Sequence, residues 1–186
     1  MSYLTEKQLR AMNFGFLGKD VKISDKAVFY EPHLQKIGNS SRIDDFVILS
    51  GKIEIGRNVH LAVQCNLAGG SEGIFIGDFS GLAYACQVFS QSDDYSGATL
   101  TNPTIPDKFK NETKSSVVIS RHCILGTNTV VFPGVKVGEG CSFAAKSLVI
   151  RNTEPWGMYA GTPVRRISDR QKELLKLENI FLDEFG

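Results

Sequence analysis

Large aliphatic residues recur at six-residue spacing through the middle of the chain, with two interruptions. The residue four places further on is almost always small, and glycine often follows the aliphatic residue directly. A period of six does not match the 3.6 residues of a helical turn, so the pattern predicts short strands joined by turns. The fifteen aliphatic positions are Ile37, Ile43, Leu49, Ile55, Leu61, Leu67, Ile76, Leu82, Val88, Ile119, Leu125, Val131, Val137, Phe143 and Val149.

Stacked units of this kind bury a continuous core, which predicts a parallel β-helix. Successive groups of three aliphatic positions divide residues 37–149 into five coils, and a weaker first coil begins at Ile23 and Phe29. All four cysteines fall on the small position of the repeat. We therefore interpret them as buried core residues rather than reactive thiols or disulfide partners. They are Cys65, Cys86, Cys123 and Cys141.

Both ends of the chain have helical patterns. Residues 5–14 open with Thr5 and place Gln8 three positions later, as in a capping box. Residues 168–184 carry leucines at helical spacing, and Ser168 is the expected N-cap. This second helix could cover the open end of the β-helix or contact another subunit.

A long insertion interrupts the repeat between Val88 and Ile119, which are 31 positions apart where six would continue the pattern. Loops of this length are uncommon in compact domains and are often functional, although a disordered insertion is the alternative. These boundaries predict one domain of four segments: an N-terminal helix in 1–20, a β-helix in 21–167, its inserted loop 89–118 and a C-terminal helix in 168–186.

Charge and hydropathy narrow the possible partners. The chain has 21 Lys and Arg residues against 20 Asp and Glu residues, so we expect no nucleic-acid partner. No apolar run approaches the ~18 residues that span a bilayer, and the N-terminus lacks the apolar core of a signal peptide. We expect no membrane insertion and a cytoplasmic location.

Four repeat units resemble the hexapeptide-repeat acyltransferases: residues 37–42 (IGNSSR), 55–60 (IGRNVH), 76–81 (IGDFSG) and 137–142 (VGEGCS). The resemblance implies an all-β fold, a left-handed parallel β-helix with a short N-terminal helix, a long inserted loop and a C-terminal helix. It also implies a homotrimer with active sites between neighbouring β-helices. The expected reaction moves an acetyl or other short acyl group from acetyl-CoA, or another acyl-CoA, to a sugar of surface-polysaccharide (lipopolysaccharide) biosynthesis.

The inserted loop departs from many sugar and antibiotic acetyltransferases of this family, which place a histidine near its start. Here the segment reads Ser92-Asp93-Asp94-Tyr95, and the loop contains no histidine. Asp94 is the first candidate for a general base, with Asp93 as its neighbour or substitute. Mutual repulsion and partial burial would raise their pKa values. Turn formation is the alternative role.

A carboxylate base suits an ammonium better than a hydroxyl, so we predict N-acylation of a nucleotide-linked amino sugar. The alternatives are O-acetylation of a sugar hydroxyl or a xenobiotic alcohol, and a non-catalytic β-helix that binds a partner. His60 is the alternative base, or a histidine with a structural hydrogen bond. Tyr95, Glu112 and His122 are candidates for binding the acceptor. No histidine pair has metal-ligand spacing, so we predict no metal.

The last coils resemble the CoA groove of the family. Small residues would let pantetheine lie against the backbone, and basic side chains would contact the phosphates. Core packing and a solvated surface are the respective alternatives. The candidates are Gly126, Thr127, Ala144, Ala145 and Pro163 for the groove, and Lys146, Arg151, Arg165 and Arg166 for the phosphates.

Overall fold

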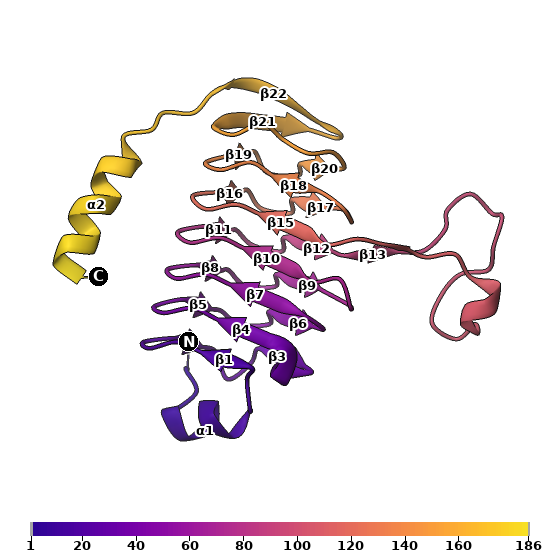
Figure 1. Cartoon of the computed structure of the whole chain (residues 1–186), viewed down its shortest axis with the longest axis horizontal. Helices are drawn as coiled ribbons and strands as arrows, with labels where there is room; N and C mark the ends of the chain where they lie inside the picture. Colours follow the sequence, from indigo (N-terminus) through magenta and orange to yellow (C-terminus); the bar gives the residue numbers. More distant parts are fainter. Residues whose placement is uncertain (1, 186) are drawn as a thin grey trace.

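The computed structural model describes residues 2–185, most of which form a solenoid of short parallel strands (Figure 1). Each coil contributes one strand to each of three sheets. The first sheet contains β1 (Phe16–Leu17), β4 (Gln35–Ile37), β7 (Ile53–Ile55), β10 (Ile74–Ile76), β15 (Val117–Ile119) and β18 (Lys136–Val137). The second contains β2 (Lys22–Ile23), β5 (Arg42–Ile43), β8 (His60–Leu61), β11 (Gly81–Leu82), β16 (Ile124–Leu125), β19 (Ser142–Phe143), β21 (Gly157–Gly161) and β22 (Val164–Asp169). The third contains β3 (Val28–Tyr30), β6 (Ile48–Ser50), β9 (Asn66–Ala68), β12 (Gln87–Phe89), β17 (Val130–Val131) and β20 (Leu148–Val149).

The strand register confirms the six-residue frame. Ile55 pairs with Ile76, and Ile76 pairs directly with Ile119 across the insertion. All fifteen predicted aliphatic positions are buried. The predicted first coil is also present as β1, β2 and β3, with Ile23 fully buried. One aliphatic stack therefore runs through each sheet and forms a continuous core.

The four cysteines are free and buried, as predicted. Their sulfurs face backbone carbonyls of the next coil, as in the 3.1 Å contact from Cys65 Sγ to Ala83 O. Burial raises the pKa of the Cys123 thiol to about 12. Because all four lie in the core, the cysteines serve as small core residues.

The N-terminal helix matches the prediction, and the C-terminal one begins later than predicted. In α1 (Glu6–Ala11), Thr5 and Gln8 form the capping box. At the other end, β21 and β22 form an antiparallel hairpin over the last coil. Ser168 pairs within that hairpin, so its assignment as a helix N-cap is wrong. Helix α2 (Leu174–Phe185) runs back beside the solenoid, and the hairpin covers the end instead (Figure 1).

The insertion leaves the solenoid between β12 and β15 as an antiparallel ribbon of β13 (Gln91–Ser92) and β14 (Thr113–Lys114). Beyond the ribbon, the chain projects away from the solenoid and contains a short 3-10 turn, Asp107–Phe109 (Figure 1). Its exposed apolar side chains include Tyr95, which is 87% exposed. None of the helices in residues 2–185 has the length and apolar character required to cross a membrane.

Candidate active site

A cavity of about 330 Å³ lies at the foot of the projecting ribbon. It brings together three of the predicted residues, Asp93, Tyr95 and Glu112. Aromatic and proline side chains of the neighbouring coils supply its apolar wall. Its lining is Phe89, Gln91, Ser92, Asp93, Tyr95, Pro103, Glu112, Phe132 and Pro133. The insertion thus forms a pocket with both acidic and apolar sides.

Asp94 does not line this pocket, because its carboxylate organises the adjacent turn. Its oxygens accept hydrogen bonds from the backbone N–H of Ser96 at 2.8 Å and the hydroxyl of Thr99 at 3.0 Å. These hydrogen bonds, that with Ser96 first, lower the pKa of Asp94, opposite to the predicted direction. Asp93 accepts one longer hydrogen bond, 3.2 Å from the backbone N–H of Asn102. In the single chain, the turn-forming role of Asp94 is therefore present.

Glu112 is held by two lysines at the base of the loop. Its carboxylate lies 2.9 Å from Lys114 Nζ and 3.2 Å from Lys110 Nζ. These contacts lower the pKa of Glu112, the hydrogen bond to Lys114 most strongly. Lys110 also pairs with Asp107. Glu112 therefore presents a carboxylate to the pocket that two lysines hold in place and in its charged form.

The groove residues predicted from the last coils stack in one column, at the corner between the second and third sheets. The backbone N–H of Lys146 donates to Thr127 O at 2.8 Å, and the Thr162 hydroxyl donates to Lys146 O at 3.0 Å. Ala144 and Ala145 are exposed along this corner. A Cβ at Gly126 would lie 2.6 Å from Ala145 N, so glycine is required there. The column includes Gly126, Thr127, Ala144, Ala145, Lys146 and Pro163.

The predicted phosphate-binding arginines are not all together. Arg165 and Arg166 lie on β22, above the end of the column. Arg166 donates to Asp169 Oδ1 at 2.8 Å, which raises the pKa of its guanidinium. Arg151 lies after β20, at the corner between the third and first sheets. Arg165 is exposed and makes the better candidate for a phosphate contact.

His60 lies on the outer face of the second sheet, apart from the loop pocket of its own chain. Its Nε2 lies 2.8 Å from Asp44 Oδ2. Arg42 Nε donates to the other oxygen of Asp44 at 2.6 Å. The structural hydrogen bond considered for His60 is therefore present. Asp44 carried no sequence signal for this role, because it occupies a corner position where Asp is common.

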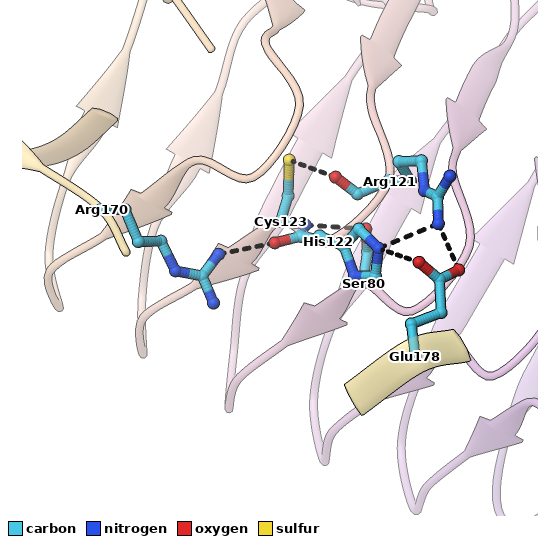
Figure 2. Close-up of polar contacts among 6 residues, drawn as sticks. All are labelled: Ser80, Arg121, His122, Cys123, Arg170 and Glu178. Carbon is cyan, nitrogen blue, oxygen red and sulfur yellow. Dashed lines mark hydrogen bonds and ion pairs between the residues drawn. The ribbon is translucent and has the colours of Figure 1, made fainter. Parts of the chain in front are cut away.

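His122 lies beneath α2 and not at the loop pocket (Figure 2). Its Nε2 lies 3.0 Å from Glu178 Oε2, and Arg121 pairs with the same carboxylate. The ring stacks on Phe79 at 5.5 Å, and Arg170 donates to the His122 carbonyl at 2.6 Å. These contacts fasten α2 to the solenoid. Neither Glu178 nor Arg170 carried a sequence signal for this role.

Within residues 2–185, no three His, Cys, Asp or Glu side chains gather in a way that could hold a metal ion. The loop pocket and the corner column offer polar groups that suit organic ligands. Carboxylates suit an amine, and a strip of exposed backbone suits an amide-containing arm.

Comparisons with known proteins, by sequence and by structure, both lead to acyltransferases. No protein-family model matches the chain. The dTDP-4-amino-4,6-dideoxy-D-glucose acyltransferase of Escherichia coli is 38% identical over 184 residues, covering 97% of this chain and 95% of that enzyme. The D94N variant of AntD, an N-acyltransferase of Bacillus cereus, has been solved in complex with dTDP and coenzyme A. It is 39% identical to this chain, the match covers both chains completely, and the TM-score is 0.98. A hexapeptide-repeat acetyltransferase of Vibrio cholerae is 20% identical, covers 91% of this chain and 83% of its own, and shares the fold with a TM-score of 0.58.

The chain therefore belongs to the family of hexapeptide-repeat acyltransferases that includes the dTDP-amino-sugar N-acyltransferases. This confirms the predicted family and the fold class, a left-handed parallel β-helix. It also confirms an acyl-CoA-dependent acyltransferase with coenzyme A as a ligand.

Proposed function

We propose that the protein transfers a short acyl group from acyl-CoA to the amino group of a dTDP-linked 4-amino-4,6-dideoxy sugar. The observation that carries this proposal is the acidic pocket of a loop without histidine, in a chain matched over its whole length by two amino-sugar acyltransferases. AntD has also been solved with 3-hydroxybutyryl-CoA, so the acyl group need not be acetyl. The predicted cytoplasmic location remains a prediction.

The loop carboxylates match the chemistry of an amine acceptor. An amino sugar arrives as an ammonium and must lose a proton before its nitrogen can attack the thioester. We assign this proton to Asp94, with Asp93 as its neighbour at the pocket wall. Bound substrates exclude water, which raises a carboxylate pKa and favours transfer from the ammonium. An aspartate of the same number is the residue replaced in two AntD variants.

The corner column is the proposed donor site. Its exposed small residues leave room for pantetheine against the backbone, with Lys146 and Arg165 placed toward the phosphates. Arg151 and Arg166 remain weaker candidates, because one lies at another corner and the other is paired with Asp169. Tyr95 and Glu112 line the acceptor side.

The function is tested by comparing two acceptors that differ in one functional group. With acetyl-CoA or 3-hydroxybutyryl-CoA, dTDP-4-amino-4,6-dideoxyglucose should release CoA thiol at least about 100-fold faster than the analogue with a 4-hydroxyl group. Preferential turnover of the hydroxyl analogue would indicate O-acylation. Absence of turnover with either, together with no CoA binding by calorimetry, would favour a non-catalytic binding module.

A trimer is supported by the outer face of the third sheet, where five of the six strands carry large apolar side chains and β9 carries Asn66 and Ala68. Isolated exposed apolar residues are ordinary, but apolar side chains that recur from coil to coil indicate an interaction surface. Tyr30 is 58% exposed and Ile150 is 43% exposed at its two ends. The row consists of Val28, Tyr30, Ile48, Phe89, Val130, Phe132, Leu148 and Ile150.

Light scattering should therefore give the mass of three chains. Val130→Arg, which places a charge in this row, should dissociate the assembly, because an unpaired charge is costly to bury. Lys136→Glu on the outer face of the first sheet is the matched control and should leave the mass unchanged. A wild-type protein with the mass of one chain would contradict the trimer.

A further inference from the structure

The outer face of the second sheet carries an aspartate–histidine pair that the proposed function has not used. The Asp44 carboxylate is only 6% exposed and receives both His60 Nε2 and Arg42 Nε. A nearly buried carboxylate with two donors is held in a fixed orientation. The His60 side chain, by contrast, is 47% exposed.

The hydrogen-bond geometry sets the tautomer of His60. A carboxylate can only accept, so the proton of the neutral imidazole lies on Nε2, and Nδ1 keeps its lone pair. Nδ1 has no hydrogen-bond partner among residues 2–185. The arrangement therefore presents a nitrogen with a free lone pair to the outside, with a carboxylate behind it that fixes the tautomer and orientation of the ring.

The space beside His60 is open. The next strand of the sheet places Gly81 in register with His60, and a Cβ at Gly81 would meet nothing within 4 Å. A cavity of about 570 Å³ covers this face and reaches α2. The charged groups that share it are already paired: Glu178 contacts His122, and Arg170 donates to backbone carbonyls. His60 is therefore the available acid–base group of this face.

The height of His60 along the solenoid matches that of the projecting ribbon. The ribbon leaves directly after β12, in the same coil as Gly81, and His60 lies one coil earlier. The apolar row on the third sheet runs the length of the solenoid, so copies that bury it lie with parallel axes. A rotation about a parallel axis keeps equal coils at equal height. The ribbon of one copy then reaches a neighbour at the level of β8 and β11.

We propose that His60 is a second acid–base group of the reaction and that Asp44 is its positioning residue. The ribbon of a neighbouring copy accepts the first proton, and His60 moves the second one. This inference rests on the proposed function. The amine nitrogen bonds to the thioester carbon, and His60 Nδ1 takes a proton from the adduct. The carbonyl re-forms as the C–S bond breaks, and the imidazolium returns that proton to the thiolate. The products are the amide, CoA thiol and the one proton accepted by the ribbon.

Two variants test the pair in the wild-type assay. His60→Gln should lower kcat about 100-fold, within the range of lost acid–base catalysis. Asp44→Asn should lower kcat while the KM values of both substrates stay unchanged, because the imidazole loses the carboxylate that fixes its tautomer and orientation. Asp45→Asn, which removes the adjacent carboxylate paired with Lys26, is the control with unchanged rate. Coenzyme A affinity and the melting temperature should not change in His60→Gln.

A mixing experiment tests the contribution in trans. Chains carrying His60→Gln are co-expressed with chains carrying Asp94→Asn, each inactive alone. Random mixed trimers should recover about a quarter of wild-type activity, since one interface in four then joins a native ribbon to a native His60. If both groups acted within one chain, no activity would return, and the trans arrangement would be wrong.

The outcomes are distinguishable from failure of the proposed function itself. Wild-type protein without turnover on any amino sugar would overturn the function and this inference together. Active wild-type protein together with a His60→Gln variant of full rate would overturn only the inference. The proton shuttle would then belong to the loop carboxylates alone.

Discussion

Asp94→Asn is expected to lower kcat/KM for the amino-sugar acceptor about 100-fold without changing the fold. Asparagine keeps the side-chain oxygen that accepts from Ser96 N–H, and it is well suited to the same turn. The negative charge is lost, and the oxygen that accepts from the Thr99 hydroxyl becomes an NH2 group that can donate to it instead. The hydrogen bonds to Ser96 and Thr99 lower the pKa of Asp94, so the native carboxylate is ionised throughout the neutral range. The defect should therefore be equally large across the neutral range, measured by thiol release at saturating acyl-CoA.

The matched control for this variant is Asp107→Asn. Asp107 is also a loop carboxylate, but its side chain is 93% exposed and it contacts only Lys110. Its replacement should leave the rate within about twofold, as is usual for surface substitutions away from a site. An Asp94→Asn protein with the native rate would restrict Asp94 to turn formation, and the base would be reassigned to Asp93.

Leu125→Ala should reduce the free energy of unfolding by about 3 kcal/mol, the usual cost of truncating a fully buried leucine. Leu125 stacks between Leu82 and Phe143 in the second sheet, so the cavity cannot close without moving two other coils. For a chain of this size, the melting temperature should fall by about 6–12 °C.

Ile124→Ala provides the comparison within the same strand. Ile124 points outward and is 48% exposed, so its truncation should cost less than about 1 kcal/mol. The two variants are measured by thermal and urea unfolding. Equal losses would show that the outer face is as tightly packed as the core, which in this chain would require a covering subunit at Ile124.

The fold was predictable because its signal is local and repeated. Each coil has to supply Ile, Leu, Val or Phe at the same three positions, so the pairings of Ile37 with Ile55 and of Ile119 with Val137 follow from the 18-residue spacing. The capping box of Thr5 and Gln8 is likewise a local pattern. The beginning of α2 was not predictable, because residues 164–169 become a strand only through pairing with β21, a tertiary contact.

The candidate site was predictable only in part, because several of its contacts are tertiary. The acidic loop and the small-residue corner could be located by their residue types. The pairing of His60 with Asp44, and of His122 with Glu178, joins residues 16 and 56 positions apart without a shared motif. Likewise, the direction of the pKa change in Asp94 depends first on hydrogen bonds from Ser96 and then on one from Thr99, and neither residue carried a sequence signal for that contact.

The insertion leaves the solenoid undisturbed, since β10 pairs with β15 and β12 pairs with β17 as if the intervening residues were absent. The strands on either side are therefore anchored independently of what lies between them. Changes in the length or composition of the ribbon cost the scaffold little, because the corner that carries it is already fixed. Recognition of the acceptor can thus diversify by exchange of one segment, while the donor column and the core remain the same.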